Sequence, residues 1–205
     1  SARFDVTYPQ FDCFGRRPPT VALAGDRVAV GTVSESGETG FARVYEKEGA
    51  EWILTTLPAP TPQGGDGFAV AIQGDTLFSG EPKKGMVHPY RKVAGTWTLE
   101  PSIPSPSGLS DGFGAALSVS GTRLLVGATS EKKAYVLELS GGAWSASAEL
   151  GPSEDDVGSF GTSVLLSGST ALVVGRRPGT QAAWVDVFTL TSGTWTLSGT
   201  LRPFG

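Results

Sequence analysis

The sequence has very little cysteine, histidine and methionine, with one of each in 205 residues. The lone cysteine, Cys13, cannot form a disulfide within the chain, and it excludes a zinc site built from several cysteines. The lone histidine, His88, excludes a site built from several histidines. We therefore predict no metal ion and no cofactor. We expect His88 to be a structural or surface residue and Cys13 to be a small buried one.

Charge and long apolar stretches are also scarce. Charged residues make up 18% of the chain and the formal net charge is −4, so the sequence shows no basic surface for nucleic acid. No apolar run approaches the roughly 18 residues that would cross a membrane. Glycine and proline are abundant instead, at 29 and 14 residues, beside 39% hydrophobic residues. That balance argues against disorder and helix bundles, and it favours short strands joined by tight turns.

Three markers repeat four times along the chain in a constant order. The first is a tryptophan after a glycine-bearing turn, with spacings of 45, 47 and 51 residues: Trp52, Trp97, Trp144 and Trp195. The second is a glycine followed by a polar residue: Gly25-Asp26, Gly74-Asp75, Gly121-Thr122 and Gly168-Ser169. The third is a phenylalanine followed by a small residue: Phe14-Gly15, Phe68-Ala69, Phe113-Gly114 and Phe160-Gly161. We expect the four periodic tryptophans to pack in the core, because burial of an indole removes about 150–250 Å² from water.

Within each copy the hydrophobic pattern has the period of two that is typical of strands. In the third copy, apolar residues alternate or run together over 117–119, 124–127, 134–137 and 144–150. Four strands of about 4–7 residues, joined by tight hairpins, make one antiparallel sheet. No stretch of the chain shows a sustained helical period, so we predict an all-β fold.

Four-stranded units that repeat about every 47 residues have the period of β-propeller blades. We predict a single β-propeller domain over residues 1–205, with four four-stranded antiparallel blades at approximately 14–57, 68–103, 113–150 and 160–201. Residues 1–13 would be a ring-sealing strand or the tail of a preceding blade. The blades would close into a four-bladed ring, form half of a larger ring, or pair with a second chain into an eight-bladed ring. A β-sandwich is the competing architecture.

Two copies of the repeat, at 113–128 and 160–175, read as Phe-Gly, an alternating strand, a glycine turn and an apolar strand that ends near a glycine. A third copy at 68–82 has Ala69 in place of the first glycine, and a fourth at 14–32 carries an Arg-Arg-Pro-Pro insertion. These segments resemble the FG-GAP repeat of bacterial extracellular proteins, and with their tryptophan hairpins they cover nearly the whole chain. The resemblance implies a β-propeller, as in integrin α-subunit heads, and binding of a ligand or partner outside the cell.

Many FG-GAP repeats carry an aspartate-rich calcium loop between the first two strands. The corresponding turns of this sequence hold a single aspartate, Asp26 or Asp75, or none. Calcium is usually bound by several carboxylates at alternating positions. We therefore predict no calcium site of the integrin type.

We predict a non-enzymatic recognition or adhesion module, extracellular or on the cell surface, that binds a protein or glycan through one loop face. That face carries the loops 32–40, 81–85, 128–132 and 175–182, and propeller strands fix a scaffold on which such loops can vary. Two alternatives stay open: a carbohydrate-active hydrolase that uses loop carboxylates, and a structural assembly unit that completes a larger propeller. A homodimer or the neighbouring blades of a longer chain would supply the partner in the last case. We expect no nucleic acid and no membrane insertion.

Six residues of the predicted loop face are candidates for ligand binding: Arg16, Arg17, Glu81, Arg176, Arg177 and Trp184. The arginine pairs lie in loops of blades one and four, which would be neighbours in a closed four-bladed ring. Guanidinium groups bind carboxylates and other anions through paired hydrogen bonds. Trp184 stands outside the tryptophan period, so it is either a ligand-stacking residue or part of the packing.

We predict no catalytic residue. Carboxylates that could serve a sugar hydrolase occur in loops at Glu81, Asp111 and 154–156, but we expect these to be solvated acidic loops. A Ser-His-Asp triad would need His88 beside a nucleophile, and the sequence contains no nucleophile-elbow pattern.

Overall fold

The computed structural model describes residues 20–33, 40–55, 57–58, 60, 67–108, 112–180 and 182–202. Cys13, Arg16, Arg17 and Asp111, together with the segment 1–13 predicted as a sealing strand or blade tail, lie outside these residues.

The described chain forms four antiparallel sheets, each with its strands in sequence order. Blade one contains β1 (Thr20–Ala24), β2 (Arg27–Val33), β3 (Gly40–Glu48) and β4 (Glu51–Thr55). Blade two contains β5 (Val70–Gln73), β6 (Thr76–Glu81), β7 (Met86–Val93) and β8 (Thr96–Leu99), and a short β9 (Ile103–Pro104) also pairs with β7. Blade three contains β10 (Phe113–Ser120), β11 (Arg123–Ala128), β12 (Lys133–Ser140) and β13 (Ala143–Leu150). Blade four contains β14 (Ser159–Ser167), β15 (Thr170–Arg176), β16 (Ala183–Thr191) and β17 (Thr194–Leu201).

The first hairpin of every blade turns on the glycine of the second sequence marker. Gly25, Gly74, Gly121 and Gly168 have φ between 55 and 63°, a region that glycine occupies without steric cost. Each begins a two-residue connection between paired strands, which is the shortest antiparallel hairpin. The marker therefore sets the register of the two inner strands in all four blades.

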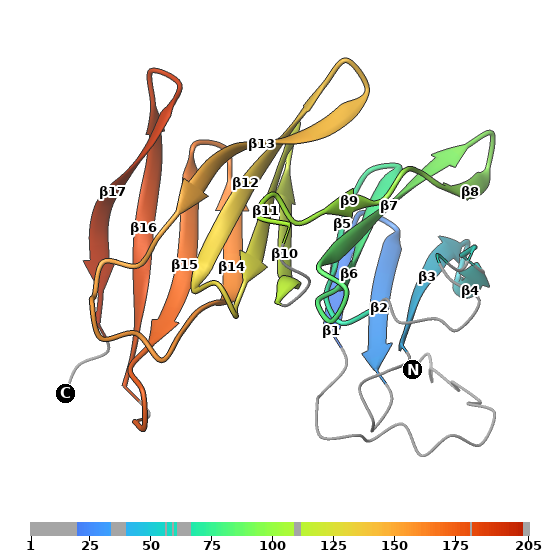
Figure 1. The fold of residues 1–205 in the computed structure, drawn as a ribbon. Coiled ribbons are helices and arrows are strands. Elements are labelled where there is room, and N and C mark those ends of the chain that lie inside the picture. The colour runs from blue at the N-terminus through green and yellow to red at the C-terminus, as the bar shows by residue number, and fades with distance from the viewer. Residues whose placement is uncertain are drawn as a thin grey trace.

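The four sheets stand side by side in chain order, with blade one at the right end of the row and blade four at the left (Figure 1). The prediction of an all-β propeller with four four-stranded blades is confirmed, and the sandwich is not formed. The first and last blades of the described chain lie at opposite ends, so the row is open rather than a closed ring of four.

Hydrophobic side chains fill the spaces between neighbouring sheets. Three clusters occupy the three junctions, and Phe78, Phe113 and Phe160 are fully buried in them. Three of the four periodic tryptophans pack in the core as expected: Trp97 is 3% exposed, Trp144 packs edge-on against Phe78 with ring centroids 5.1 Å apart, and Trp195 packs against the cluster of blades three and four. Trp52 is half-buried and lies outside the three clusters. Because one sheet cannot bury both of its faces alone, each blade depends on its neighbours.

A close backbone contact between two glycines recurs at all three junctions. Near the start of the inner strand, Gly67, Gly114 or Gly161, each with φ between 78 and 94°, lies against a glycine of the preceding blade. A Cβ atom added to that preceding glycine would lie 2.3 Å from the facing carbonyl oxygen at Gly31, 2.0 Å at Gly80 and 2.0 Å at Gly127. No side chain fits there, so the spacing of the blades depends on glycine.

This contact corrects the sequence alignment of the repeats in two places. In blade two the equivalent glycine is Gly67, so Phe68 follows the contact glycine, whereas Phe113 and Phe160 precede theirs. In blade four, Val164 pairs with Val173 as Leu117 pairs with Val126, which places Val174, not Gly175, at the position of Gly127. Blade four thus has a valine where the other three blades have the contact glycine.

We expect Gly127→Ala to lower the free energy of unfolding by about 1–3 kcal/mol or more, because the new methyl group overlaps the Gly161 carbonyl oxygen. Urea unfolding followed by tryptophan fluorescence measures the change. The matched control is Gly151→Ala, where a Cβ meets nothing within 4 Å and φ is not positive. Equal stability of the two variants would contradict the steric role of Gly127.

Candidate functional site

One position on the third strand of every blade carries a polar side chain on the same face of the sheet, which in blades two to four is the face toward the preceding blade. The equivalent residues are Arg43, His88, Tyr135 and Asp186, which pair across the sheet with Val30, Ser79, Val126 and Val173. His88, Tyr135 and Asp186 are at most 3% exposed. A buried polar group must find hydrogen-bond partners or destabilise the fold, so what each residue contacts defines its role.

In blades three and four this position anchors the linker from the preceding blade. The Tyr135 hydroxyl donates to Glu131 (2.7 Å), which also accepts from Ser105 and Ser107 of the linker. Burial and the neighbouring Glu131 carboxylate raise the pKa of Tyr135, so the phenol stays protonated as a donor. Asp186 accepts from the backbone and hydroxyl of Ser153 at 2.7 and 2.6 Å.

In blade two the same position holds His88, and its partners make a different constellation. His88 Nε2 lies 3.0 Å from Glu81 Oε2, and His88 Nδ1 lies 2.8 Å from Ser102 Oγ. The other carboxylate oxygen of Glu81 pairs with Lys84 Nζ at 2.7 Å. Serine, histidine and glutamate are therefore connected in a line, with the imidazole in the middle.

Strand pairing explains how distant residues reach this cluster. Glu81 ends β6 and His88 lies near the start of β7, so the hairpin at 82–85 brings them to one face of the sheet. Ser102 directly precedes β9, which pairs with Val87 and Met86. Glu81 and His88 are each 3% exposed, whereas Ser102 is exposed. The hydroxyl is thus the end of the line that solvent and a ligand can reach.

The hydrogen bonds assign the roles of the two imidazole nitrogens. A carboxylate can only accept, so Nε2 of the neutral ring carries the proton and donates to Glu81. Nδ1 is then the acceptor for the Ser102 hydroxyl. This is the arrangement that activates a serine: a base removes its proton and a buried carboxylate stabilises the resulting imidazolium. The nitrogens are exchanged relative to the usual triad, but the proton path is the same.

The six predicted ligand-binding residues are dispersed. Glu81 belongs to the His88 cluster, and Arg176 and Arg177 are exposed at the end of blade four. Arg16 and Arg17 lie outside the described residues, and the closed ring that would bring their blade beside Arg176 and Arg177 is not formed.

Trp184 is 3% exposed and lies over Gly175, where a Cβ would be 2.3 Å from the indole ring. Its Nε1 donates to Asp186 at 3.1 Å. Of the two roles considered for Trp184, the structure shows packing.

Arg177 forms an ion pair instead of an open anion site. Glu154 accepts from Arg177 at 3.0 Å and from Arg202 at 2.5 Å. Hydrogen bonds from Arg202 and Arg177 lower the pKa of Glu154. The acidic stretch 154–156 therefore includes a carboxylate that is already occupied by two guanidinium groups.

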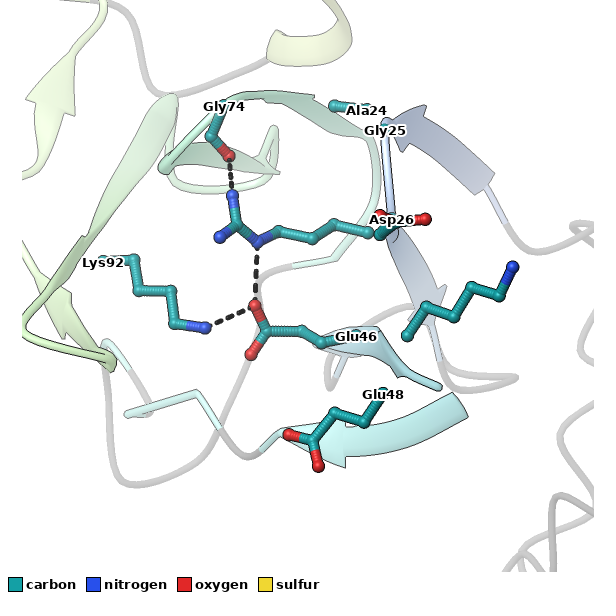
Figure 2. Close-up of a pocket in the computed structure, with 9 residues that line it drawn as sticks. Ala24, Gly25, Asp26, Glu46, Glu48, Gly74 and Lys92 are labelled. Carbon is teal, nitrogen blue, oxygen red and sulfur yellow. Dashed lines mark hydrogen bonds and ion pairs between the residues drawn. The ribbon is translucent and has the colours of Figure 1, made fainter. Parts of the chain in front are cut away.

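A cavity of about 500 Å³ opens between the hairpins of blades one and two, away from His88. Figure 2 shows Glu46 in it with Lys92 directed at its carboxylate, and Arg27 pairs with the same carboxylate. The two cations lie 2.8 and 2.6 Å from Glu46 Oε1. Arg27 also donates to Gly74 O, at 2.8 Å across the junction. Arg27, Glu46 and Lys92 thus tie the two blades together across this cavity.

The part of the chain that the structure describes contains no group of three or more histidine, cysteine, aspartate or glutamate side chains that could hold a metal ion. In the same residues, no helix is long and apolar enough to cross a membrane.

No protein-family model and no curated protein matches this sequence, but solved structures share its fold. A Bacteroides uniformis protein with the provisional name 6-phosphogluconolactonase has a TM-score of 0.65 at 13% identity, covering 89% of this chain and 56% of the other. The periplasmic gluconolactonase of Pseudomonas aeruginosa has 0.62 at 16%, covering 91% and 57%. Kuenenia stuttgartiensis hydrazine synthase has 0.64 at 14%, covering 98% and 53%. This chain spans about half the length of these structures.

These comparisons overturn the prediction that the chain is not an enzyme. Two of the structures with its fold are named as lactonases, which are hydrolytic enzymes. The prediction rested on the absence of a local nucleophile motif, whereas Ser102, His88 and Glu81 meet through strand pairing. Glu81 and His88 could have been placed together from the hairpin between them. Ser102 could not, because an irregular segment precedes β9.

We expect Glu46→Gln to reduce the free energy of unfolding at neutral pH and to make this free energy depend less on pH. Burial raises the pKa of Glu46, but hydrogen bonds from Lys92, Arg27 and Thr55 outweigh it, and the pKa lies below its ordinary value. The wild-type carboxylate thus stabilises the fold above about pH 4.3, and this contribution is lost as the pH falls through the folded-state pKa. Unfolding in urea from pH 7 to pH 3 measures it. The exposed Glu48→Gln on the same cavity is the control, and parallel pH curves for both variants would refute the effect.

Proposed function

We propose that this chain is a hydrolase that opens the ester bond of a lactone derived from a sugar acid, with Ser102 as its nucleophile. The observation that carries the proposal is the line Ser102–His88–Glu81, with an exposed hydroxyl at one end and a buried carboxylate at the other. The substrate class is supported by the two lactonase names among the proteins of similar fold. The proposal keeps the hydrolase alternative of the sequence analysis but replaces the loop carboxylates by a serine nucleophile, with Glu81 at the end of β6 as the supporting carboxylate.

The reaction follows from the hydrogen-bond directions. Ser102 Oγ attacks the lactone carbonyl carbon while its proton passes to His88 Nδ1, and Glu81 stabilises the imidazolium from the Nε2 side. The ring C–O bond then breaks, and the His88 proton goes to the departing alkoxide. Water, deprotonated by His88, hydrolyses the acyl-serine and releases the hydroxy acid. Lys84, paired with the second oxygen of Glu81, keeps the carboxylate in place.

We also propose that the protein works outside the cytoplasm and that its repeats are related to the FG-GAP family. The periplasmic location named for one protein of similar fold supports the first point. Phe113-Gly114 and Phe160-Gly161 support the second, because each phenylalanine is fully buried and each glycine makes the contact between blades.

We expect Ser102→Ala to lower kcat/KM for a gluconolactone by about 10³-fold or more, because the acylated atom is removed. The stability of this variant should change by less than about 1 kcal/mol, since Ser102 is exposed. Lactone opening is followed by acid release in a pH-stat. Ser145→Ala, an exposed serine on the outer strand of blade three, is the control and should keep full activity.

A phosphonate ester that labels activated serines distinguishes a nucleophilic Ser102 from a Ser102 that only anchors the chain. Mass analysis should find Ser102 labelled in the wild type, and the label should be lost in His88→Gln. If Ser102→Ala retains wild-type lactonase activity, or if the wild type neither opens lactones nor takes the label, the proposed function is wrong. The cluster would then be an anchor like those at Tyr135 and Asp186.

A further inference from the structure

The two ends of the row expose sheet faces that are built like the buried junctions. We call the face of a blade toward its predecessor the leading face and the face toward its successor the trailing face. On the trailing face of blade three, Leu150 pairs with Ala134 and is 2% exposed. The equivalent Leu201 of blade four pairs with Val185 and is 58% exposed. Leu165 on the same trailing face is 57% exposed.

The leading face of blade one is apolar as well. Val21 and Leu23 on β1 are 70% and 69% exposed, and they occupy the positions of Leu117 and Val119, which pack against the core between blades two and three. Proteins rarely leave apolar surface of this kind uncovered, so both faces indicate missing neighbours.

Blade four also carries a hydrogen-bonding group of the type that joins consecutive blades. In blades two and three the residue before the first hairpin turn contacts the turn of the following blade: Gln73 accepts from Gly121 N at 2.9 Å, and Ser120 accepts from Gly168 N at 3.0 Å. The equivalent residue of blade four is Ser167, which is exposed. The turn glycine that remains for it is Gly25 of blade one, which stands at the other end of the row.

The glycine contact distinguishes between possible neighbours. Val174 replaces the contact glycine on the trailing face of blade four, so a blade that presents a glycine carbonyl there would overlap the valine side chain. Blades two, three and four present Gly67, Gly114 and Gly161 three residues before Val70, Leu117 and Val164. Three residues before Val21, the sequence of blade one has Pro18, outside the described residues. The trailing face of blade four, which has Val174 in place of the contact glycine, thus matches blade one, whose sequence lacks the facing glycine.

We propose that two copies of this chain associate end to end, with blade four of each copy against blade one of the other. Each junction joins unlike faces, and the two together close the assembly with twofold symmetry. The result is a ring of eight blades in which Ser167 of one copy accepts from Gly25 N of the other. Leu165 of blade four is equivalent to Ser118 of blade three, and Leu23 of blade one is equivalent to Leu166 of blade four. Ser118 accepts from Leu166 N between blades three and four, so Leu165 lies beside Leu23 across the new junction.

The solution mass tests this proposal on the 205-residue chain. Light scattering after gel filtration should give about twice the chain mass of 21.2 kDa. Leu165→Glu and Leu23→Glu should each halve the measured mass, because each places a charge in an apolar junction. The double variant Leu23→Glu with Leu165→Lys should restore the dimer. Val93→Glu, at an apolar residue 54% exposed on a hairpin of blade two, is the control and should leave the mass unchanged.

A monomeric wild type at the concentrations of the other assays would overturn the proposal and leave these faces to blades of another chain. A dimer that survives both single variants would overturn it too, since its contact would lie elsewhere. Circular dichroism is the control for folding. If the spectra of both single variants match that of the wild type, a change of mass cannot be assigned to unfolding.

Discussion

The architecture depends on one steric constraint, the backbone contact between a glycine of one blade and a glycine of the next. At Gly80 and Gly127 the facing carbonyl oxygen lies where a side chain would begin. Sheets that approach so closely near the inner strands can pack phenylalanine and tryptophan farther out. The hydrophobic junctions, the anchored linkers and the His88 cluster all lie within the spacing that these glycines set.

Within that spacing, one position on the third strand of each blade holds a different polar residue. Tyr135 and Asp186 anchor linkers, and Asp186 accepts from Ser153, Thr200 and Trp184. His88 at the same position lies between a carboxylate and a hydroxyl instead. The same position of a repeated scaffold can therefore hold different polar side chains, because each blade supplies partners that satisfy a buried polar group. The fold does not dictate an activity, but it buries Glu81 and His88 beside an exposed Ser102.

The sequence was sufficient for the fold because strand alternation and turn glycines are local properties. Trp97 and Trp144 pack as their period indicated. The register was harder, since Phe68 and Gly175 resemble the repeat markers but stand two residues and one residue away from the equivalent positions. The site was harder still: Glu81 and His88 were considered separately, and Ser102 joins them only after an irregular segment. Pairing of Arg176 and Arg177 with the first blade required a closed ring, which no local pattern could decide.

The buried carboxylate of Asp186 has a mechanical consequence. It holds the linker between blades three and four through Ser153 while it belongs to blade four itself. A pulling force on the C-terminal end of the chain must therefore break the hydrogen bonds from Ser153 to this carboxylate before the last sheet can separate. Because every blade touches only its neighbours, such a rupture would proceed sheet by sheet, in discrete steps from the pulled end.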